Sequence, residues 1–252
     1  LNGKNNYGIV VNGNVNLASG TSLNDGVIDV YGENSTAIYQ DRANDFQQNG
    51  QIWIIENNTN GIRVDQGTMT NGSSGMIIIE ASSNSTGMAA TNINGASKII
   101  NNGAIKIEEG SSNSIGMYGV NGGTVNNTLE NTALIDLSIM GTGKNNVGVV
   151  NIASKFQNDG SIVLNDQAAS GSNLGNNTAL YNEAGTVTLG SSSNIEISSG
   201  GNNKGIYIKN GGTVNTGGTI SLTSSENAAD YDYGIYMDSS SSNILNLGNT
   251  VF

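Results

Sequence analysis

The sequence predicts an all-β fold, a right-handed parallel β-helix of about nine coils of roughly 28 residues, with three short strands in each coil. Two repeated patterns of apolar residues carry this prediction. The composition supports it, because glycine accounts for 36 of the 252 residues, asparagine is more frequent still, and proline is absent. Glycine and asparagine favour turns between short strands, and strands that donate their N–H groups to neighbouring coils exclude proline.

The first pattern is a small residue followed by an apolar one, and we call this apolar residue the anchor. Such pairs recur along the whole chain at a mean step of about 28 residues, a length typical of one unit of a solenoid. We expect each anchor to lie in a strand and to point inward, so that the next residue points outward. The pairs are Gly8-Ile9, Ala37-Ile38, Gly61-Ile62, Gly87-Met88, Gly116-Met117, Gly148-Val149, Ala179-Leu180, Gly205-Ile206 and Gly234-Ile235.

The second pattern is an apolar–x–apolar triplet, and period-two alternation of this kind predicts a strand with one buried face. A weaker third strand is expected between these two, as at 123–125, 185–187 and 212–214, where the sequence reads Gly-Thr-Val. A leucine-rich repeat is the competing solenoid, but its helices would not tolerate this density of glycine and asparagine. The triplets are Ile28/Val30, Ile52/Ile54, Ile77/Ile79, Ile105/Ile107, Ile135/Leu137, Ile162/Leu164, Ile195/Ile197 and Ile220/Leu222.

The repeat fills residues 1–252 as one β-helix segment without a domain boundary, and we expect this segment to be an excerpt of a longer chain. Amide side chains precede many of the triplets. If they stack on successive coils, they could form a ladder of hydrogen bonds, and the alternative is an ordinary solvated turn. The amides in question are Asn24, Gln48, Asn101, Asn131 and Asn158.

Charge and composition exclude several classes of function. A net charge of −11 with only 9 basic residues argues against binding to nucleic-acid phosphates or to anionic lipid. The absence of cysteine and histidine excludes disulfides, zinc sites of the usual kind and Ser-His-Asp triads. We expect no cofactor, and neither an apolar run long enough to span a membrane nor a signal peptide is visible.

Some phrases of the repeat resemble a known family. The segment 114–118, Ser-Ile-Gly-Met-Tyr, is followed by Gly-Gly-Thr-Val-Asn at 122–126, and Lys-Gly-Ile-Tyr at 204–207 is followed by a similar phrase at 212–220. These resemble passenger repeats of large type V autotransporters, most closely those of fusobacterial outer-membrane adhesins. The resemblance implies a secreted passenger, carried by a C-terminal β-barrel translocator that is absent from this chain. It also implies exposure on the bacterial surface and attachment to other bacteria or to host cells.

The residue that follows each anchor suggests a binding face. It is tyrosine in three successive units, at Tyr181, Tyr207 and Tyr236, and these side chains should stack outward in a ladder, with Tyr231 and Tyr233 close by. An exposed aromatic ladder can bind sugar rings or the apolar surface of a partner. The alternative is that the tyrosines only stabilise the sheet. We expect the partner to be a host or bacterial surface protein or a glycan, and lateral self-association of rods is a further possibility.

Segments of variable length gather at one corner of the predicted coil, and the longest are 165–178 and 223–233. Such loops often line the interaction face of a solenoid, although neutral insertions would look the same. The second loop could ligate calcium through carboxylates, but it lacks a calcium-repeat signature, and a solvated acidic loop is the alternative. Its acidic residues are Glu226, Asp230, Asp232 and Asp238.

A catalytic site must also be considered, because glycan-cleaving β-helices use carboxylates on adjacent coils. The best candidates are Asp41, Arg42, Arg63 and Asp65, which ordinary cross-strand charge pairing would explain equally well. Lys106 and Asp136 form a similar structural pair. We therefore expect an adhesive shaft and not an enzyme. The alternatives are a polysaccharide lyase or hydrolase and a passive, self-associating spacer.

Overall fold

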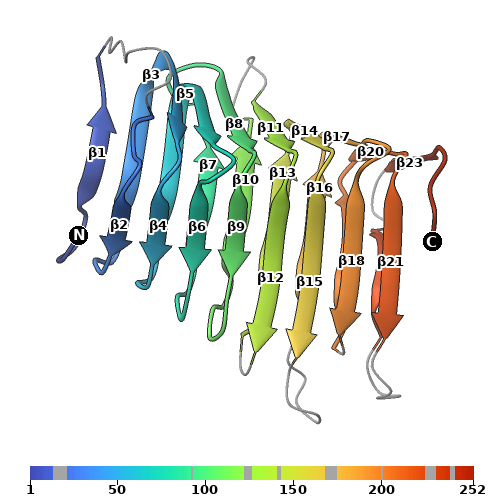
Figure 1. Ribbon diagram of the computed structural model, residues 1–252. Coiled ribbons are helices and arrows are strands. Elements are labelled where there is room, and N and C mark those ends of the chain that lie inside the picture. Colours follow the sequence, from blue (N-terminus) through green and yellow to red (C-terminus); the bar gives the residue numbers. More distant parts are fainter. Residues whose placement is uncertain are drawn as a thin grey trace.

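The computed structural model describes residues 1–13, 22–91, 93–121, 127–140, 143–167, 175–199, 201–224, 231–238 and 242–252. Over these residues the chain is a parallel β-solenoid of about 7 turns, spaced about 28 residues apart, without a helix. Figure 1 shows a rod in which the strands run across the long axis while the chain advances from one end to the other. The predicted class of fold is therefore confirmed.

The apolar–x–apolar triplets form one sheet of eight parallel strands in the order β2-β4-β6-β9-β12-β15-β18-β21. This sheet is the front layer in Figure 1. Its strands are β2 (Val27–Val30), β4 (Gln51–Ile54), β6 (Met76–Ile79), β9 (Ala104–Ile107), β12 (Leu134–Met140), β15 (Ser161–Gln167), β18 (Asn194–Ser199) and β21 (Thr219–Ser224).

The other strands form a second sheet with two stacks, which the long strands β3 and β5 join by running through both. One stack holds β1 (Tyr7–Val11), β3 (Thr36–Gln48), β5 (Asn60–Asn71), β7 (Thr86–Ala90), β10 (Ile115–Val120), β13 (Val147–Ile152), β16 (Thr178–Glu183), β19 (Lys204–Lys209) and β22 (Tyr233–Met237). The other continues from β3 and β5 through β8 (Ser97–Asn101), β11 (Thr128–Asn131), β14 (Lys155–Asn158), β17 (Thr186–Leu189), β20 (Thr213–Thr216) and β23 (Ile244–Leu247).

The predicted files of apolar side chains run along the inside of the rod. Ile52 pairs with Ile77, which pairs in turn with Ile105, and all three are fully buried. The anchors also pair from coil to coil, and they are buried from Ile38 to Ile206, whereas Ile9 and Ile235 at the two ends are partly buried. Stacking like on like gives each coil the same apolar contacts with its two neighbours, which is the source of stability in a solenoid. The paired anchors are Ile9, Ile38, Ile62, Met88, Met117, Val149, Leu180, Ile206 and Ile235.

Strands are found at two of the three Gly-Thr-Val places, as β17 and β20. Val187 in β17 pairs with Val214 in β20, and both side chains are buried. Residues 123–125 lie outside the described part of the chain. In that coil the same file is occupied by Leu129 of β11, which pairs with Ile99 and Phe156. In the described part of this coil, the apolar member of the file is therefore Leu129.

The expected amide ladder is present inside the rod. Asn71 Nδ2 donates to Asn101 Oδ1 at 2.7 Å, Asn101 Nδ2 to Asn131 Oδ1 at 2.8 Å, and Asn131 Nδ2 to Asn158 Oδ1 at 2.7 Å. Gln48 donates to Asn71, and Asn24 Nδ2 donates to Gln48 Oε1 at 3.3 Å. The alternative of a solvated turn is wrong, because every member from Gln48 to Asn158 is fully buried. Asn71 was not foreseen.

A second use of asparagine lies at the corner before each anchor strand from β1 to β19. In successive coils an asparagine occupies the left-handed region with φ of 52 to 60°, which asparagine tolerates better than most residues. The next residue is polar and accepts a hydrogen bond from its equivalent one coil earlier, as Ser85 Oγ does from the Thr59 N–H at 3.1 Å. These corner asparagines are Asn5, Asn34, Asn58, Asn84, Asn113, Asn145, Asn176 and Asn202.

Candidate binding face

The outward row predicted from the anchors is present in the structure. The side chains that follow the anchors pair from coil to coil, so they stack in one line along the rod. Two members, Ala89 and Val150, are nearly buried because they are small and stand between larger neighbours. The row reads Val10, Tyr39, Arg63, Ala89, Tyr118, Val150, Tyr181, Tyr207 and Tyr236.

Tyr181, Tyr207 and Tyr236 form the expected tyrosine ladder on β16, β19 and β22. The ring centroids of Tyr181 and Tyr207 are 5.2 Å apart at 87°, and those of Tyr207 and Tyr236 are 5.2 Å apart at 77°. Edge-to-face contacts at this distance are favourable between aromatic rings. Tyr236 is 37% exposed. The ladder thus stabilises the sheet and also presents an aromatic edge to solvent.

Tyr233 extends the ladder sideways. Its ring centroid lies 5.4 Å from that of Tyr236, and its side chain is 39% exposed. Tyr231 lies just before β22 and is 67% exposed, but it takes part in none of the ring contacts found in the described residues. Of the five predicted tyrosines, the structure therefore brings four together.

Lys204 was missed by the sequence reasoning, although it begins β19 and pairs with Tyr233 of the next coil. Its Nζ lies 5.9 Å from the ring centroid of Tyr207 and 5.7 Å from that of Tyr236, within the range of a cation–π contact. Nζ also donates to Asn176 Oδ1 at 3.2 Å. Partial burial lowers the pKa of Lys204 from its ordinary value.

Lys204 stands at the edge of a hollow of about 450 Å³, which we call the lysine hollow. Its lining includes two corner asparagines and two tyrosines of the neighbouring strand. The hollow therefore combines aromatic rings, side-chain amides and one cation. Its lining residues are Asn176, Gly201, Asn202, Lys204, Tyr233 and Tyr236.

Tyr181, the first tyrosine of the ladder, is held by a carboxylate. The Tyr181 hydroxyl donates to Glu183 Oε2 at 2.5 Å, and Asn210 Nδ2 donates to the other oxygen of the same carboxylate. Burial first, and then this hydrogen bond, raise the pKa of Tyr181, while the hydrogen bond lowers the pKa of Glu183. Burial and the charge of Asp238 raise the pKa of Tyr207. These phenols stay neutral well above neutral pH.

The candidate catalytic group at the other end of the row is a satisfied charge cluster. Asp65 is 1% exposed and accepts hydrogen bonds from Arg63 Nε at 3.0 Å, Arg63 Nη2 at 3.3 Å and the Tyr39 hydroxyl at 2.8 Å. Thr91 Oγ1 donates to it as well. A register shift after Gln40 makes Asp41 pair with Gln66 and not with Asp65. The exposed pair of carboxylates that a glycan-cleaving groove would need is therefore not formed by these two residues.

The acidic residues proposed as calcium ligands do not form a site in the described residues: one has a structural role, and two lie outside the described part of the chain. Asp232 Oδ1 accepts a hydrogen bond from the Asn203 N–H at 2.9 Å, which continues the file of acceptors before the anchor strands. Glu226 and Asp230 lie outside the described residues. Within the described ranges no group of three acidic, cysteine or histidine side chains is placed to hold a metal ion. The two longest loops also fall partly outside, at 168–174 and 225–230.

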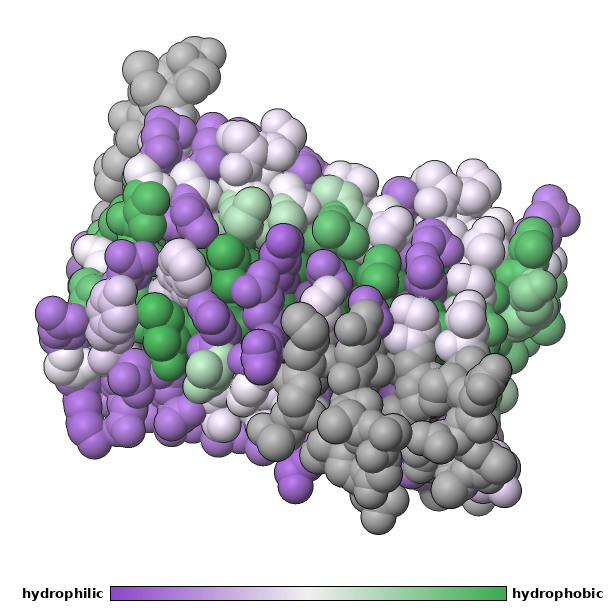
Figure 2. Space-filling model, turned by 60° about the horizontal axis from the view of Figure 1, so that its bottom comes forward, coloured by the Kyte–Doolittle hydropathy of each residue, from purple (hydrophilic) through white to green (hydrophobic). Residues whose placement is uncertain are grey.

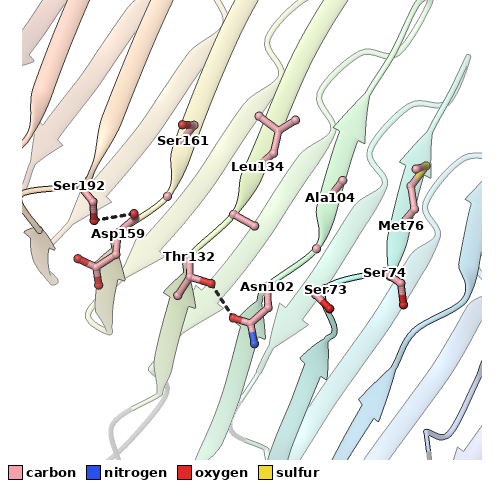
Figure 3. A pocket seen from close by; sticks show the side chains of 14 residues that line it. Ser73, Ser74, Met76, Asn102, Ala104, Thr132, Leu134, Asp159, Ser161 and Ser192 are labelled. Carbon is pink, nitrogen blue, oxygen red and sulfur yellow. Dashed lines mark hydrogen bonds between the residues drawn. The ribbon is translucent and has the colours of Figure 1, made fainter.

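Two further hollows were not foreseen. A groove of about 510 Å³ follows the corner in front of the eight-stranded sheet, where glycine, alanine and serine dominate (Figure 3). Its polar side chains are used internally, since Thr132 Oγ1 donates to Asn102 Oδ1 at 2.7 Å and Ser192 Oγ to the Asp159 carbonyl at 2.9 Å. A smaller hollow of about 190 Å³ lies over Ala89, between Arg63 and Tyr118.

The surface between these features is mixed in character. On the face drawn in Figure 2, apolar side chains form a broken band along the rod and alternate with polar ones, and another apolar group lies at the C-terminal end. Among the coloured residues of that view no broad apolar patch stands out along the shaft. Association through a large apolar interface would require such a patch.

Comparisons with protein-family models, with curated proteins and with solved structures find no match to this chain. Over the described ranges no helix is both long enough and apolar enough to cross a membrane.

Proposed function

We propose that this chain is part of the shaft of a bacterial surface adhesin of the autotransporter-passenger kind, and that its tyrosine ladder with the lysine hollow binds a glycan or a surface protein. In this proposal the shaft is right-handed and has nine coils with three strands each, it is secreted, and it stands on the outside of the cell. The support is the β-solenoid itself together with the resemblance of its repeats to such passengers.

The ladder carries the functional part of the proposal. Tyrosine is suited to contact surfaces, because its ring is rigid and apolar while its hydroxyl can form hydrogen bonds. Three tyrosines would stabilise a sheet equally well if they were covered. Tyr233 and Tyr236 are instead substantially exposed beside a hollow that also contains amides and a cation. A pocket with aromatic walls and a few polar groups is the usual form of a small binding site.

We propose no catalytic role for the cluster around Asp65. A general acid or base needs a free lone pair or proton within reach of a substrate. The Asp65 carboxylate already accepts four hydrogen bonds and is removed from solvent. This arrangement fits a structural ion pair that fixes Arg63 and Tyr39 in the outward row.

Attachment of protein-coated beads to host and bacterial cells tests the proposed function. We expect the double variant Tyr207→Ala/Tyr236→Ala to lose at least about tenfold in attachment, as aromatic contact residues commonly do. Tyr31→Ala is the matched control, because Tyr31 is 50% exposed and lies outside the ladder. It should attach like the unaltered protein.

Circular dichroism and thermal unfolding must show that the double variant keeps its fold. Equal attachment of folded wild-type and double-variant beads would contradict the proposed binding role and would favour a passive spacer. Lateral self-association would appear separately, as a dependence of sedimentation on protein concentration.

A further inference from the structure

We propose that the lysine hollow binds the anionic group of an acidic glycan, a carboxylate or a sulfate, and that Lys204 supplies the opposing charge. This inference rests on the proposed function and names the class of ligand for the same face. The tyrosines would contact the sugar ring, while the ammonium group of Lys204 would contact its negative substituent.

The first support is the local charge. The chain has 20 acidic and 9 basic residues, so it repels anions in general. Four of the basic side chains form ion pairs with carboxylates in the described structure, namely Lys4 with Glu33, Arg42 with Asp41, Arg63 with Asp65 and Lys98 with Glu130. Lys204 is not among the ion pairs of the described residues. Its nearest polar partner there is a neutral amide, Asn176 Oδ1.

The second support is the position of the ammonium group. Lys204 Nζ lies over the rings of Tyr207 and Tyr236, at 5.9 and 5.7 Å from their centroids, and Lys204 lines the hollow together with Tyr236. An ammonium group has three N–H donors. Asn176 Oδ1 takes one, and Asn176 Nδ2 donates to Asn145 Oδ1 at 3.2 Å, which fixes the orientation of this amide. Two donors remain for a ligand within the described surroundings.

The third support is partial desolvation. A charge that is partly removed from water interacts more strongly with an opposite charge than a fully solvated one does. Burial lowers the pKa of Lys204, and a bound anion would raise this pKa again. Binding should therefore weaken as alkaline pH removes the proton from Lys204.

The shape of the hollow favours a sugar as the carrier of the anion. Tyr233 and Tyr236 meet at 68°, so their rings form a corner against which the apolar face of a ring can pack. The amide of Asn202 also lines the hollow and offers both a donor and an acceptor for hydroxyl groups. A free inorganic anion would use Lys204 but not the aromatic corner.

The experiment measures binding of matched oligosaccharides to the purified chain by calorimetry. The probes are a uronic-acid oligosaccharide, its carboxyl-reduced neutral form, and a sulfated form of the neutral chain. The variants are Lys204→Gln, which removes the charge, and Lys204→Arg, which keeps it. Lys155→Gln is the matched control, since Lys155 is an exposed lysine at the start of β14.

We expect the wild type to bind an acidic probe about five- to tenfold more tightly than the neutral one, as for one partly shielded ion pair. Lys204→Gln should lose this preference, while Lys204→Arg and Lys155→Gln should keep it. The carboxylate and sulfate probes identify which anion the hollow prefers. Inorganic sulfate alone should bind far more weakly than either acidic probe.

Equal affinity for acidic and neutral probes, unchanged by Lys204→Gln, would overturn this inference. The proposed function would survive that result if Tyr207→Ala/Tyr236→Ala still abolished attachment to cells. If no probe binds while attachment still depends on the tyrosines, the ligand is not an acidic glycan and only the present inference fails. If attachment is also indifferent to the tyrosines, both proposals fail.

Discussion

Individual polar residues in this chain owe their roles to their place in the coil. Asp65 is buried and accepts four hydrogen bonds. Asp41, on the preceding coil, lies at an irregularity of β3 and forms a long ion pair, at 3.6 Å, with Arg42 Nη1. A buried carboxylate that is changed to an amide keeps one acceptor oxygen but presents N–H groups in place of the other, so some of its donors lose their acceptor. The two aspartates should therefore differ sharply in their contribution to stability.

We predict that Asp65→Asn lowers the free energy of unfolding by about 3 kcal/mol, because it breaks a buried, hydrogen-bonded ion pair. Asp41→Asn should change it by less than about 1 kcal/mol. Urea denaturation followed by circular dichroism measures both. Similar values for the two variants would mean that the Asp65 cluster is not the structural element described above.

Tyr39 gives this cluster a dependence on pH. Burial first, and then the hydrogen bond to Asp65, raise the pKa of Tyr39 from 10.0 to about 12. A group whose pKa is raised on folding contributes stability that is complete below its unfolded pKa and is lost as pH rises through the folded one. Stability should therefore fall between about pH 10 and pH 12.

Tyr39→Phe removes this titrating group, so we predict a smaller loss of stability for the variant than for the wild type between about pH 10 and pH 12. Part of the loss should remain, because burial also raises the pKa of Tyr118 and Tyr207. Thermal unfolding at a series of pH values provides the test. Parallel pH profiles for the two proteins would show that Tyr39 is not held as described.

At the scale of the element, the amide ladder is the feature that links the coils inside the rod. From Gln48 to Asn131 each amide accepts from one neighbouring amide and donates to the next, so the loss of one interior member removes two buried hydrogen bonds. The exposed bond from Asn246 Nδ2 to Asn215 Oδ1, at 2.6 Å, joins the same side chains in the same way but in contact with water. The two bonds therefore differ mainly in burial.

We predict that Asn131→Ala lowers the free energy of unfolding by about 2–4 kcal/mol, because it leaves Asn101 Nδ2 and Asn158 Oδ1 without this bond in the interior. Asn215→Ala should cost less than about 0.5 kcal/mol, as is usual at the surface. Chemical denaturation provides both values. A cost for Asn131→Ala as small as that for Asn215→Ala would contradict the structural role of the ladder.

At the scale of the whole molecule, each coil contacts only its two neighbours, so the rod should tolerate the removal of one complete coil. Leu134 and Ser161 are equivalent positions in β12 and β15. Deleting 134–160 joins Ala133 to Ser161 and sets Ile162 above Ile105 without a change of register. It also removes Val150 and brings Tyr118 next to Tyr181 in the outward row.

We predict that the 134–160 deletion folds into a rod shorter by about 4.8 Å, the spacing of strands in a sheet. Deleting 134–146 removes β12 alone and should instead destabilise the protein, because β9 and β15 lose their common neighbour in the eight-stranded sheet. Small-angle scattering and thermal unfolding distinguish the two outcomes. Equal stability of the two deletions would contradict stacking by whole coils.

The repeat period of the sequence was enough to predict both the apolar files inside the rod and the outward row that follows the anchors, because equivalent positions of a solenoid have equivalent neighbours. It was not enough where a turn changes length. Asn71 was not predicted, because its corner has two more residues than that of Asn101. The placement of Lys204 depends on side-chain directions in three coils, which no local pattern encodes.

The most direct test of the proposed binding face is chemical labelling of tyrosine on the rod, free and bound to cells or to an acidic glycan surface. Tyr207 and Tyr236 should become protected on binding, while exposed Tyr31, which lies outside the ladder, should be labelled to the same extent in both states. Unchanged labelling of Tyr207 and Tyr236 in the bound state would show that the partner, whatever its chemistry, is held elsewhere on the rod.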